Sequence, residues 1–252
     1  MSMNQCADLL LLQLVPKDRI ASITYNAHGG AEALFPGADA GIAINHGAAE
    51  EIAAEKPDLI LAGSFSTPTT RAVARKAAAP LIELQDPSSF DDIRRVVRQA
   101  GAAVGETGRA EALIARMDAQ LSALAAAKPA RPYTIAAWTG DSVPGKRTLA
   151  NAVIEAAGAV NIAARNDTVT YGSFGVEELV TAQPDVLMVG AHSGAQPTLQ
   201  ELKSRHPMVR TLFAGRTVTY QETALDCGLP QTADAAVRLH ADLSAIGRRG
   251  AP

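Results

Sequence analysis

The sequence predicts an α/β protein in which two Rossmann-like lobes, each with a parallel-rich sheet, are joined by one long helix. Short apolar runs alternate with helical segments over short connections, a pattern typical of parallel sheets covered by helices on both faces. Between these stretches, residues 109–128 contain neither Gly nor Pro, and their apolar residues recur at helical spacing. We therefore expect a long bridging helix at residues 107–128.

The position of this helix divides the chain into three parts. Residues 1–88 are expected to form the N-terminal lobe, residues 89–129 a connecting helical segment, and residues 130–252 the C-terminal lobe. Thr107 suits the start of the bridging helix as an N-cap, and Pro129 suits its end. Periodicity alone leaves an alternative open, in which the long helix is one more packed helix of a single α/β domain.

In the first lobe, a Leu-rich helix and a short strand precede residues 25–41, whose glycines and prolines predict a loop without regular structure. The alternation of helices and strands becomes regular after this loop. The expected helices are residues 7–15, 48–55, 70–79 and 90–104, and the expected strands are residues 20–24, 59–62 and 81–84.

The second lobe repeats the alternation. Its expected strands are residues 134–138, 186–189 and 217–220, its expected helices are residues 149–157, 176–182, 199–204 and 233–246, and residues 139–147 and 165–173 are expected to be loops. A short internal repeat accompanies this pattern. Glu50-Glu51-Ile52 and Glu177-Glu178-Leu179 are each followed, at the same distance, by Pro-Asp and an apolar run. This self-similarity predicts two copies of one supersecondary unit.

The composition limits the kinds of partner. A net charge of −3, 19% charged residues and the lack of a basic run argue against nucleic acid or an anionic membrane surface. Aromatic residues make up only 4% of the chain, so an aromatic side chain in a loop is a better ligand candidate than usual. Trp138 is the only tryptophan.

The N-terminal region and the cysteines bear on location. The apolar run near the start lacks a preceding basic region and a small-residue cleavage site, and no apolar stretch approaches the length of a membrane span. Cys6 and Cys227 are the two cysteines, and their spacing fits no metal site. They could pair in an oxidising compartment, which would suit an exported protein, or each could be a buried free thiol.

Several motifs, taken with the long helix, resemble the periplasmic binding proteins of ABC importers for ferric siderophores, haem and cobalamin. They are S-x-N-x-C-x-D at residues 2–8, E-x-I-x4-P-D-L-I at 50–60, G-x-x-N at 158–161, S-F-G-x-E-x-L-x4-P-D-V at 173–186 and H-P-x-V at 206–209. The resemblance covers nearly the whole chain. It implies a bridging helix that limits hinge motion, a ligand in the cleft between two lobes, and binding without enzymatic turnover or a cofactor.

The resemblance also implies a partner and a location. It predicts a monomer that captures a metal chelate or corrinoid in the periplasm and docks onto the permease dimer of an ABC importer. Members of the family usually begin with a signal and a strand ahead of the Ser-x-Asn motif. Neither precedes the motif here, so the sequence leaves open whether the start is truncated and whether this first strand is present. The sequence leaves open whether the protein is free or lipid-anchored.

Candidate ligand residues come from the loops that follow the strands, because open parallel sheets bind ligands outside the carboxyl ends of their strands. A flat chelate offers apolar faces and peripheral oxygens, which aromatic rings and a few donors match. Each candidate also has a structural interpretation: a core tryptophan at a strand end, aromatic rings that cap the lobe cores, or a solvated lysine. The candidates are Tyr25, Phe65, Trp138, Lys146, Tyr171 and His192.

Three histidines suggest an alternative, a site for a free transition metal such as zinc or manganese, because imidazole suits such ions. His28, His46 and His192 stand in separate loops without an acidic partner in an evident pattern, so we expect no metal site. One of the histidines could still be an axial ligand of a haem or corrinoid metal.

Glu50 and Glu177 begin the two repeated helices, where a carboxylate interacts favourably with the helix dipole. The resemblance implies a second role, in which one glutamate on each lobe engages arginines of the permease dimer. Two equivalent charges suit a two-fold partner. We therefore expect Glu50 and Glu177 to be docking residues.

A nucleotide-dependent enzyme is the competing class of protein. Residues 140–148 follow a strand and precede a helix, as a phosphate-binding loop does. However, Arg147 stands where such a loop needs Ser or Thr to hold magnesium, and Pro144 stiffens the backbone. A two-lobed glycosyltransferase belongs to the same alternative.

Overall fold

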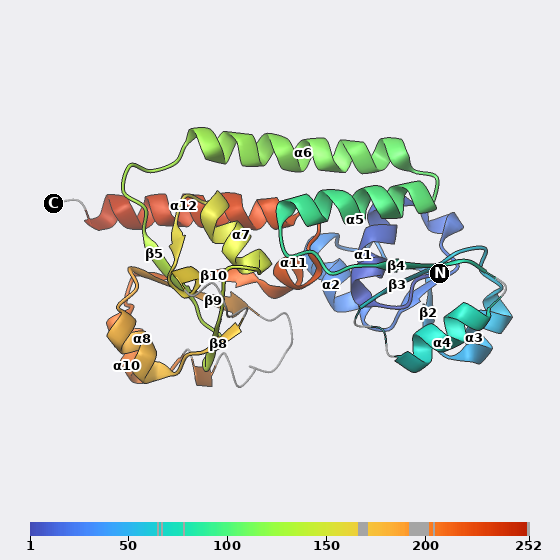
Figure 1. Ribbon diagram of the computed structural model, residues 1–252, viewed down its shortest axis with the longest axis horizontal. Helices are drawn as coiled ribbons and strands as arrows, with labels where there is room; N and C mark the ends of the chain where they lie inside the picture. Colours follow the sequence, from blue (N-terminus) through green and yellow to red (C-terminus); the bar gives the residue numbers. More distant parts are fainter. Residues whose placement is uncertain are drawn as a thin grey trace. The chain divides into compact units, whose positions relative to one another are not determined.

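The structure is a computed structural model, and it describes residues 1–64, 66, 68–77, 79–165, 171–191, 202–203 and 205–250 (Figure 1). The chain divides into two compact units. The first comprises Met1–Arg116 with Cys227–Pro230, and the second comprises Met117–Asp226 with Gln231–Pro252. Both units are mixed α/β with parallel sheets, and the division falls within α6 (Thr107–Ala126), so the expected fold class is confirmed. The three-part boundaries at residues 88 and 129 stay a prediction.

The first unit contains two separate two-stranded parallel sheets. Strand β1 (Ser22–Thr24) pairs with β2 (Ala43–Asn45), and β3 (Ile60–Gly63) pairs with β4 (Leu81–Leu84). The first residues of the chain lie between the two pairs: the Ser2 amide donates to the Ser22 carbonyl at 3.2 Å, and Ser2 forms a parallel bridge with Leu61. The sequence left the presence of a first strand open, and residues at the start of the chain lie at this place.

Helices α1 (Gln5–Leu14), α2 (Ala27–Leu34), α3 (Ala49–Glu55), α4 (Pro68–Lys76) and α5 (Phe90–Ala103) complete the first unit. Helix α2 corrects the expectation of a loop at residues 25–41. Two glycines in its interior lower its intrinsic helix propensity by about 1 kcal/mol each. However, Ala27, Gly30 and Ala31 are buried, and tertiary packing of small residues outweighs a weak propensity.

The second unit contains a four-stranded parallel sheet in the order β10-β9-β5-β7. These strands are β5 (Thr134–Ala137), β7 (Val160–Asn161), β9 (Val186–Ala191) and β10 (Thr217–Gln221). Its helices are α7 (Leu149–Ala156), α8 (Val176–Ala182), α10 (Pro207–Leu212), α11 (Glu222–Cys227) and α12 (Thr232–Gly250). The expected helix at residues 199–204 lies for the most part outside the described residues.

A short antiparallel pair, β6 (Ser142–Pro144) with β8 (Tyr171–Ser173), lies in the segments that the sequence predicted as loops. Pro144 has no amide hydrogen to donate to a neighbouring strand, so the sequence predicted a loop rather than a strand here. Trp138 packs nearby in the core of this unit, is 1% exposed, and donates its indole N–H to the Phe174 carbonyl at 2.8 Å. The indole thereby links the end of β5 to the segment after β8.

A disulfide joins Cys6 of α1 to Cys227 at the end of α11, with their Cα atoms 5.0 Å apart. Both cysteines belong to the first unit, because residues 227–230 return to it from the second. In the part of the chain that the structure describes, no helix combines the length and apolar character needed to cross a bilayer.

Candidate ligand-binding site

An exposed aromatic pair lies at the carboxyl edge of the first sheet. Tyr25 follows β1 and His46 follows β2, and these strands run parallel with Thr24 opposite Asn45, so the two side chains leave the sheet at the same edge. Their rings stack with centroids 5.3 Å apart and an interplanar angle of 15°. Tyr25 is 58% exposed, and the His46 side chain is 66% exposed. The Tyr25–His46 stack therefore offers a flat aromatic surface to a ligand.

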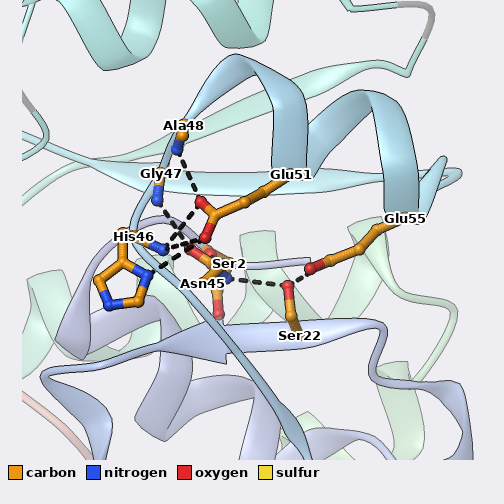
Figure 2. A network of polar contacts seen from close by, with 8 residues as sticks. All are labelled: Ser2, Ser22, Asn45, His46, Gly47, Ala48, Glu51 and Glu55. Atoms are coloured by element: carbon orange, nitrogen blue, oxygen red, sulfur yellow. Dashed lines mark hydrogen bonds and ion pairs between the residues drawn. The ribbon is translucent and has the colours of Figure 1, made fainter.

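Glu51 fixes the histidine of this stack (Figure 2). The His46 amide donates to Glu51 Oε2 at 2.9 Å, and the His46 ring nitrogen Nδ1 lies 3.2 Å from Oε1. The Ala48 amide donates to Oε2 at 2.8 Å, which caps the start of α3. Hydrogen bonds from the Ala48 and His46 amides hold the pKa of Glu51 below its usual value. A charged carboxylate therefore faces the imidazole at neutral pH.

A buried polar network holds the loop beneath the stack. The Asn45 amide group donates to the Ser2 carbonyl at 3.1 Å and to Ser22 Oγ at 2.9 Å, and the Gly47 amide donates to Asn45 Oδ1 at 3.2 Å. Ser22 Oγ in turn donates to the Glu55 carboxylate. Because Asn45 is fully buried, these bonds anchor residues 45–47 to two strands (Figure 2). These buried hydrogen bonds hold the loop that carries His46 in place.

Tyr171 and Asp226 form the exposed part of a second polar group, which lies in the second unit. Tyr171 is 64% exposed on β8. Protein atoms packed around the Asp226 carboxyl group, together with the negative charge of Glu222, raise the pKa of Asp226 to about 6. Burial of the Tyr171 hydroxyl and the charge of Asp226 raise the pKa of Tyr171. A phenol that stays protonated is a hydrogen-bond donor, so this group offers both a donor and acceptors.

Two further side chains support this group. Burial, followed by the charge of Glu222, raises the pKa of Tyr220 at the end of β10. The carboxylate of Glu222 lies against the backbone of Gly190 in β9, where an added Cβ would stand 2.2 Å from Oε1. A side chain at position 190 would therefore require this carboxylate to move. The group therefore lies at the carboxyl ends of two adjacent parallel strands, where open α/β sheets bind ligands.

The six predicted ligand residues fall into three classes. Tyr25 and Tyr171 are exposed at strand edges, and Lys146 is exposed in the segment before α7. Trp138 is a core residue without an exposed face, which fits its structural interpretation. Phe65 and His192 lie outside the described residues. Sequence reasoning named His46 only as one of three histidines that could be an axial ligand of a chelate metal, and it did not name Asp226.

The histidines do not converge on a metal site within the described residues. His28 Nδ1 lies 2.7 Å from Asp39 Oδ2 at an exposed position, whereas His46 contacts Glu51. Nowhere in the described part of the chain do three or more His, Cys, Asp or Glu side chains form a group that could hold a metal ion.

Helices α3 and α8 each carry two consecutive glutamates in the first turn, and the two glutamates of each pair make different contacts. The second glutamate caps its own helix in each copy: Glu51 receives the Ala48 amide, and Glu178 receives the Gly175 amide at 2.8 Å. The first glutamate of each pair, Glu50 or Glu177, is exposed in the first turn. Their neighbours cap the helices, and the first-turn position of Glu50 and Glu177 still fits the favourable interaction with the helix dipole that the sequence gave as the alternative.

Comparison with known proteins supplies the family. The model of the family described as periplasmic binding protein matches residues 9–218. Among curated proteins, a cobalamin-binding protein of Halobacterium salinarum is 32% identical over 146 residues, which cover 56% of this chain and 40% of that protein. The match therefore spans less than half of the relative's length.

Similar solved structures share the fold. The apo periplasmic haem-binding protein RhuT from Roseiflexus sp. RS-1 superposes with a TM-score of 0.76 at 23% identity, covering 97% of each chain. The periplasmic vitamin B12 binding protein BtuF of Vibrio cholerae gives a TM-score of 0.69 at 18% identity, covering 98% of this chain and 96% of that chain. Because the family model matches most of the sequence, this chain belongs to the periplasmic binding protein family.

Proposed function

We propose that the protein captures an iron chelate, either a siderophore or haem, or cobalamin in the periplasm and delivers it to the permease of an ABC importer. The main support for this proposal is the Tyr25–His46 stack, because an exposed, flat aromatic surface whose loop is held by buried hydrogen bonds suits a planar macrocycle or chelate. The names of the similar proteins, which bind haem, vitamin B12 or cobalamin, support the same ligand class. The role proposed is binding without turnover, free in the periplasm or lipid-anchored.

Within this function, the exposed candidates are the proposed ligand contacts. Tyr25 offers its ring face, Tyr171 a ring and a phenol donor, and Lys146 a cation for a peripheral carboxylate or oxygen. Phe65 and His192 stay proposals from the sequence. Trp138 is proposed to support β8 and its Tyr171 from the core, since its indole holds the Phe174 carbonyl.

Thermal unfolding with a ligand panel tests the proposal. The panel contains cyanocobalamin, haemin, several ferric siderophores, zinc, manganese and nucleotides. A chelate at about one hundred times its dissociation constant should add about 2.7 kcal/mol to the free energy of unfolding, and it should be recovered chemically unchanged. Stabilisation by free zinc or manganese alone would support a metal-binding protein instead. Stabilisation by nucleotides alone would overturn the binding-protein function.

The permease-docking role of Glu50 and Glu177 rests on their exposure, on their equivalent positions in the repeat, and on the neighbouring glutamates that already cap the helices. We expect the double charge reversal Glu50→Arg with Glu177→Arg to abolish uptake by the reconstituted importer, because like charges would then face the permease arginines. The dissociation constant of the chelate should stay unchanged.

The matched control is Glu155→Arg, which reverses an exposed glutamate of α7 outside the repeat. This variant should transport as the wild type does. Normal uptake by the Glu50→Arg with Glu177→Arg variant would contradict the docking role and would not affect the proposed capture of the chelate.

A further inference from the structure

Glu51 makes contacts that its counterpart in the repeat does not share. Both Glu51 and Glu178 accept the backbone amide that precedes their helix, at 2.8 Å in each case. Glu51 additionally accepts the His46 amide at 2.9 Å and faces His46 Nδ1 at 3.2 Å. In the second copy, Ser173 occupies the position that corresponds to His46, so no imidazole stands there. The additional contacts of Glu51 therefore go beyond those of a helix cap.

These contacts set the proton positions on the imidazole. A carboxylate only accepts hydrogen bonds, so Nδ1 of the neutral His46 ring carries the hydrogen and Nε2 keeps its lone pair. This arrangement is the one by which a carboxylate fixes the tautomer and orientation of a histidine whose other nitrogen faces a ligand. The ring is also held nearly parallel to Tyr25. The tautomer and the plane of the imidazole are thus both fixed while most of the side chain is exposed.

We propose that Glu51 is a positioning residue for ligand capture, which holds the His46 imidazole against Tyr25 so that Nε2 presents an electron pair to the bound chelate. The inference rests on the proposed function. Nε2 then accepts a hydrogen bond from a peripheral N–H or O–H of the chelate, or it binds an open coordination position of the metal. Both partners share the chemistry of an electron-pair acceptor.

The internal repeat supplies the control for the test. Glu51→Gln and Glu178→Gln should each weaken a helix cap and lower the free energy of unfolding by a similar, small amount. Only Glu51→Gln should weaken chelate binding, by about tenfold, because it disturbs the imidazole as well as the cap. Dissociation constants are measured by calorimetric titration with cyanocobalamin, haemin and a ferric hydroxamate in parallel.

A second variant tests whether Glu51 acts through His46. If it does, Glu51→Gln should have no further effect on the dissociation constant in a His46→Ala background, although each single variant weakens binding. ¹⁵N NMR of the ligand-free protein gives an independent readout. The glutamine NH₂ group can donate to Nδ1, so Glu51→Gln should move the His46 hydrogen from Nδ1 to Nε2, whereas Glu178→Gln should leave the His46 tautomer unchanged.

The outcomes separate this inference from the proposed function. Equal chelate affinities of Glu51→Gln, Glu178→Gln and the wild type would overturn the positioning role alone, and so would additive losses in the double variant. No binding of any chelate by the wild type would overturn the proposed function, and the positioning role with it. A change in the visible spectrum of the bound chelate on His46→Ala would assign Nε2 to the metal; weaker binding with an unchanged spectrum would assign it to a peripheral donor.

Discussion

Asp8 is a fully buried carboxyl group that joins three parts of the first unit. It accepts hydrogen bonds from the Ser2 hydroxyl and from the Thr24 amide at 3.0 Å, and it lies on α1. Burial raises the pKa of Asp8 from 3.8 to about 6. The folded protein therefore binds this proton more tightly than the unfolded chain does. The resulting stabilisation is complete at low pH and is lost as the pH rises to about 6.

The variant Asp8→Asn, which does not titrate, isolates this contribution. Between pH 4 and pH 7, the free energy of unfolding of the wild type should fall relative to that of Asp8→Asn by about 2 to 3 kcal/mol. Urea unfolding of both proteins over this pH range measures the difference. A difference that does not vary with pH would show that Asp8 titrates alike in the folded and unfolded chains.

Trp138 and Tyr171 should respond in opposite ways to substitution. Trp138→Phe removes the bond to the Phe174 carbonyl and leaves a buried acceptor without its donor, so the free energy of unfolding should fall by about 1 to 3 kcal/mol with the chelate affinity unchanged. Tyr171→Ala alters an exposed side chain, so chelate binding should weaken while stability changes by roughly 0.5 kcal/mol or less.

Chemical unfolding and calorimetric titration of the two variants give the four values. If Trp138→Phe weakened chelate binding and left the free energy of unfolding unchanged, Trp138 would instead be a ligand contact.

At the scale of elements, segments with a clear helical or apolar pattern were predictable, whereas the three-residue strands β2, β6 and β8 were not. The bridging helix, predicted at residues 107–128, forms as α6 from Thr107 to Ala126, and the helix predicted at residues 176–182 has those bounds in α8. Strand β2 (Ala43–Asn45) was missed because a three-residue strand is too short to show alternation, and two of its residues are exposed.

The missed strand explains why His46 was not listed with the ligand residues. Tyr25 was predicted from its place after β1, a strand that the sequence does indicate. His46 lies at the same edge only because β1 pairs with β2. A helix and a loop separate these strands in the sequence, and local periodicity does not predict pairing over such a separation. The contacts of Glu51 were hidden for the same reason, because they depend on where His46 lies.

At the scale of the whole molecule, the disulfide between Cys6 and Cys227 fastens α1 to the segment that returns from the second unit. The double variant Cys6→Ser with Cys227→Ser should lower the free energy of unfolding by about 3 to 5 kcal/mol, because the crosslink restrains an unfolded loop that spans most of the chain. Urea unfolding with and without dithiothreitol measures this. Reductant should bring the wild type to the stability of the variant, and equal stability of the two proteins without reductant would contradict the expectation.

The return of residues 227–230 to the first unit also sets an order of assembly during biosynthesis. A chain made from its N-terminus presents residues 1–116 early, yet this unit lacks one of its segments until residues 227–230 have been synthesised. The second unit likewise waits for residues 231–252, including α12. Cys6 can therefore pair with Cys227 only after the 221 residues that separate them in sequence have been added. Neither unit can therefore complete its fold before the residues that follow Asp226 have been synthesised.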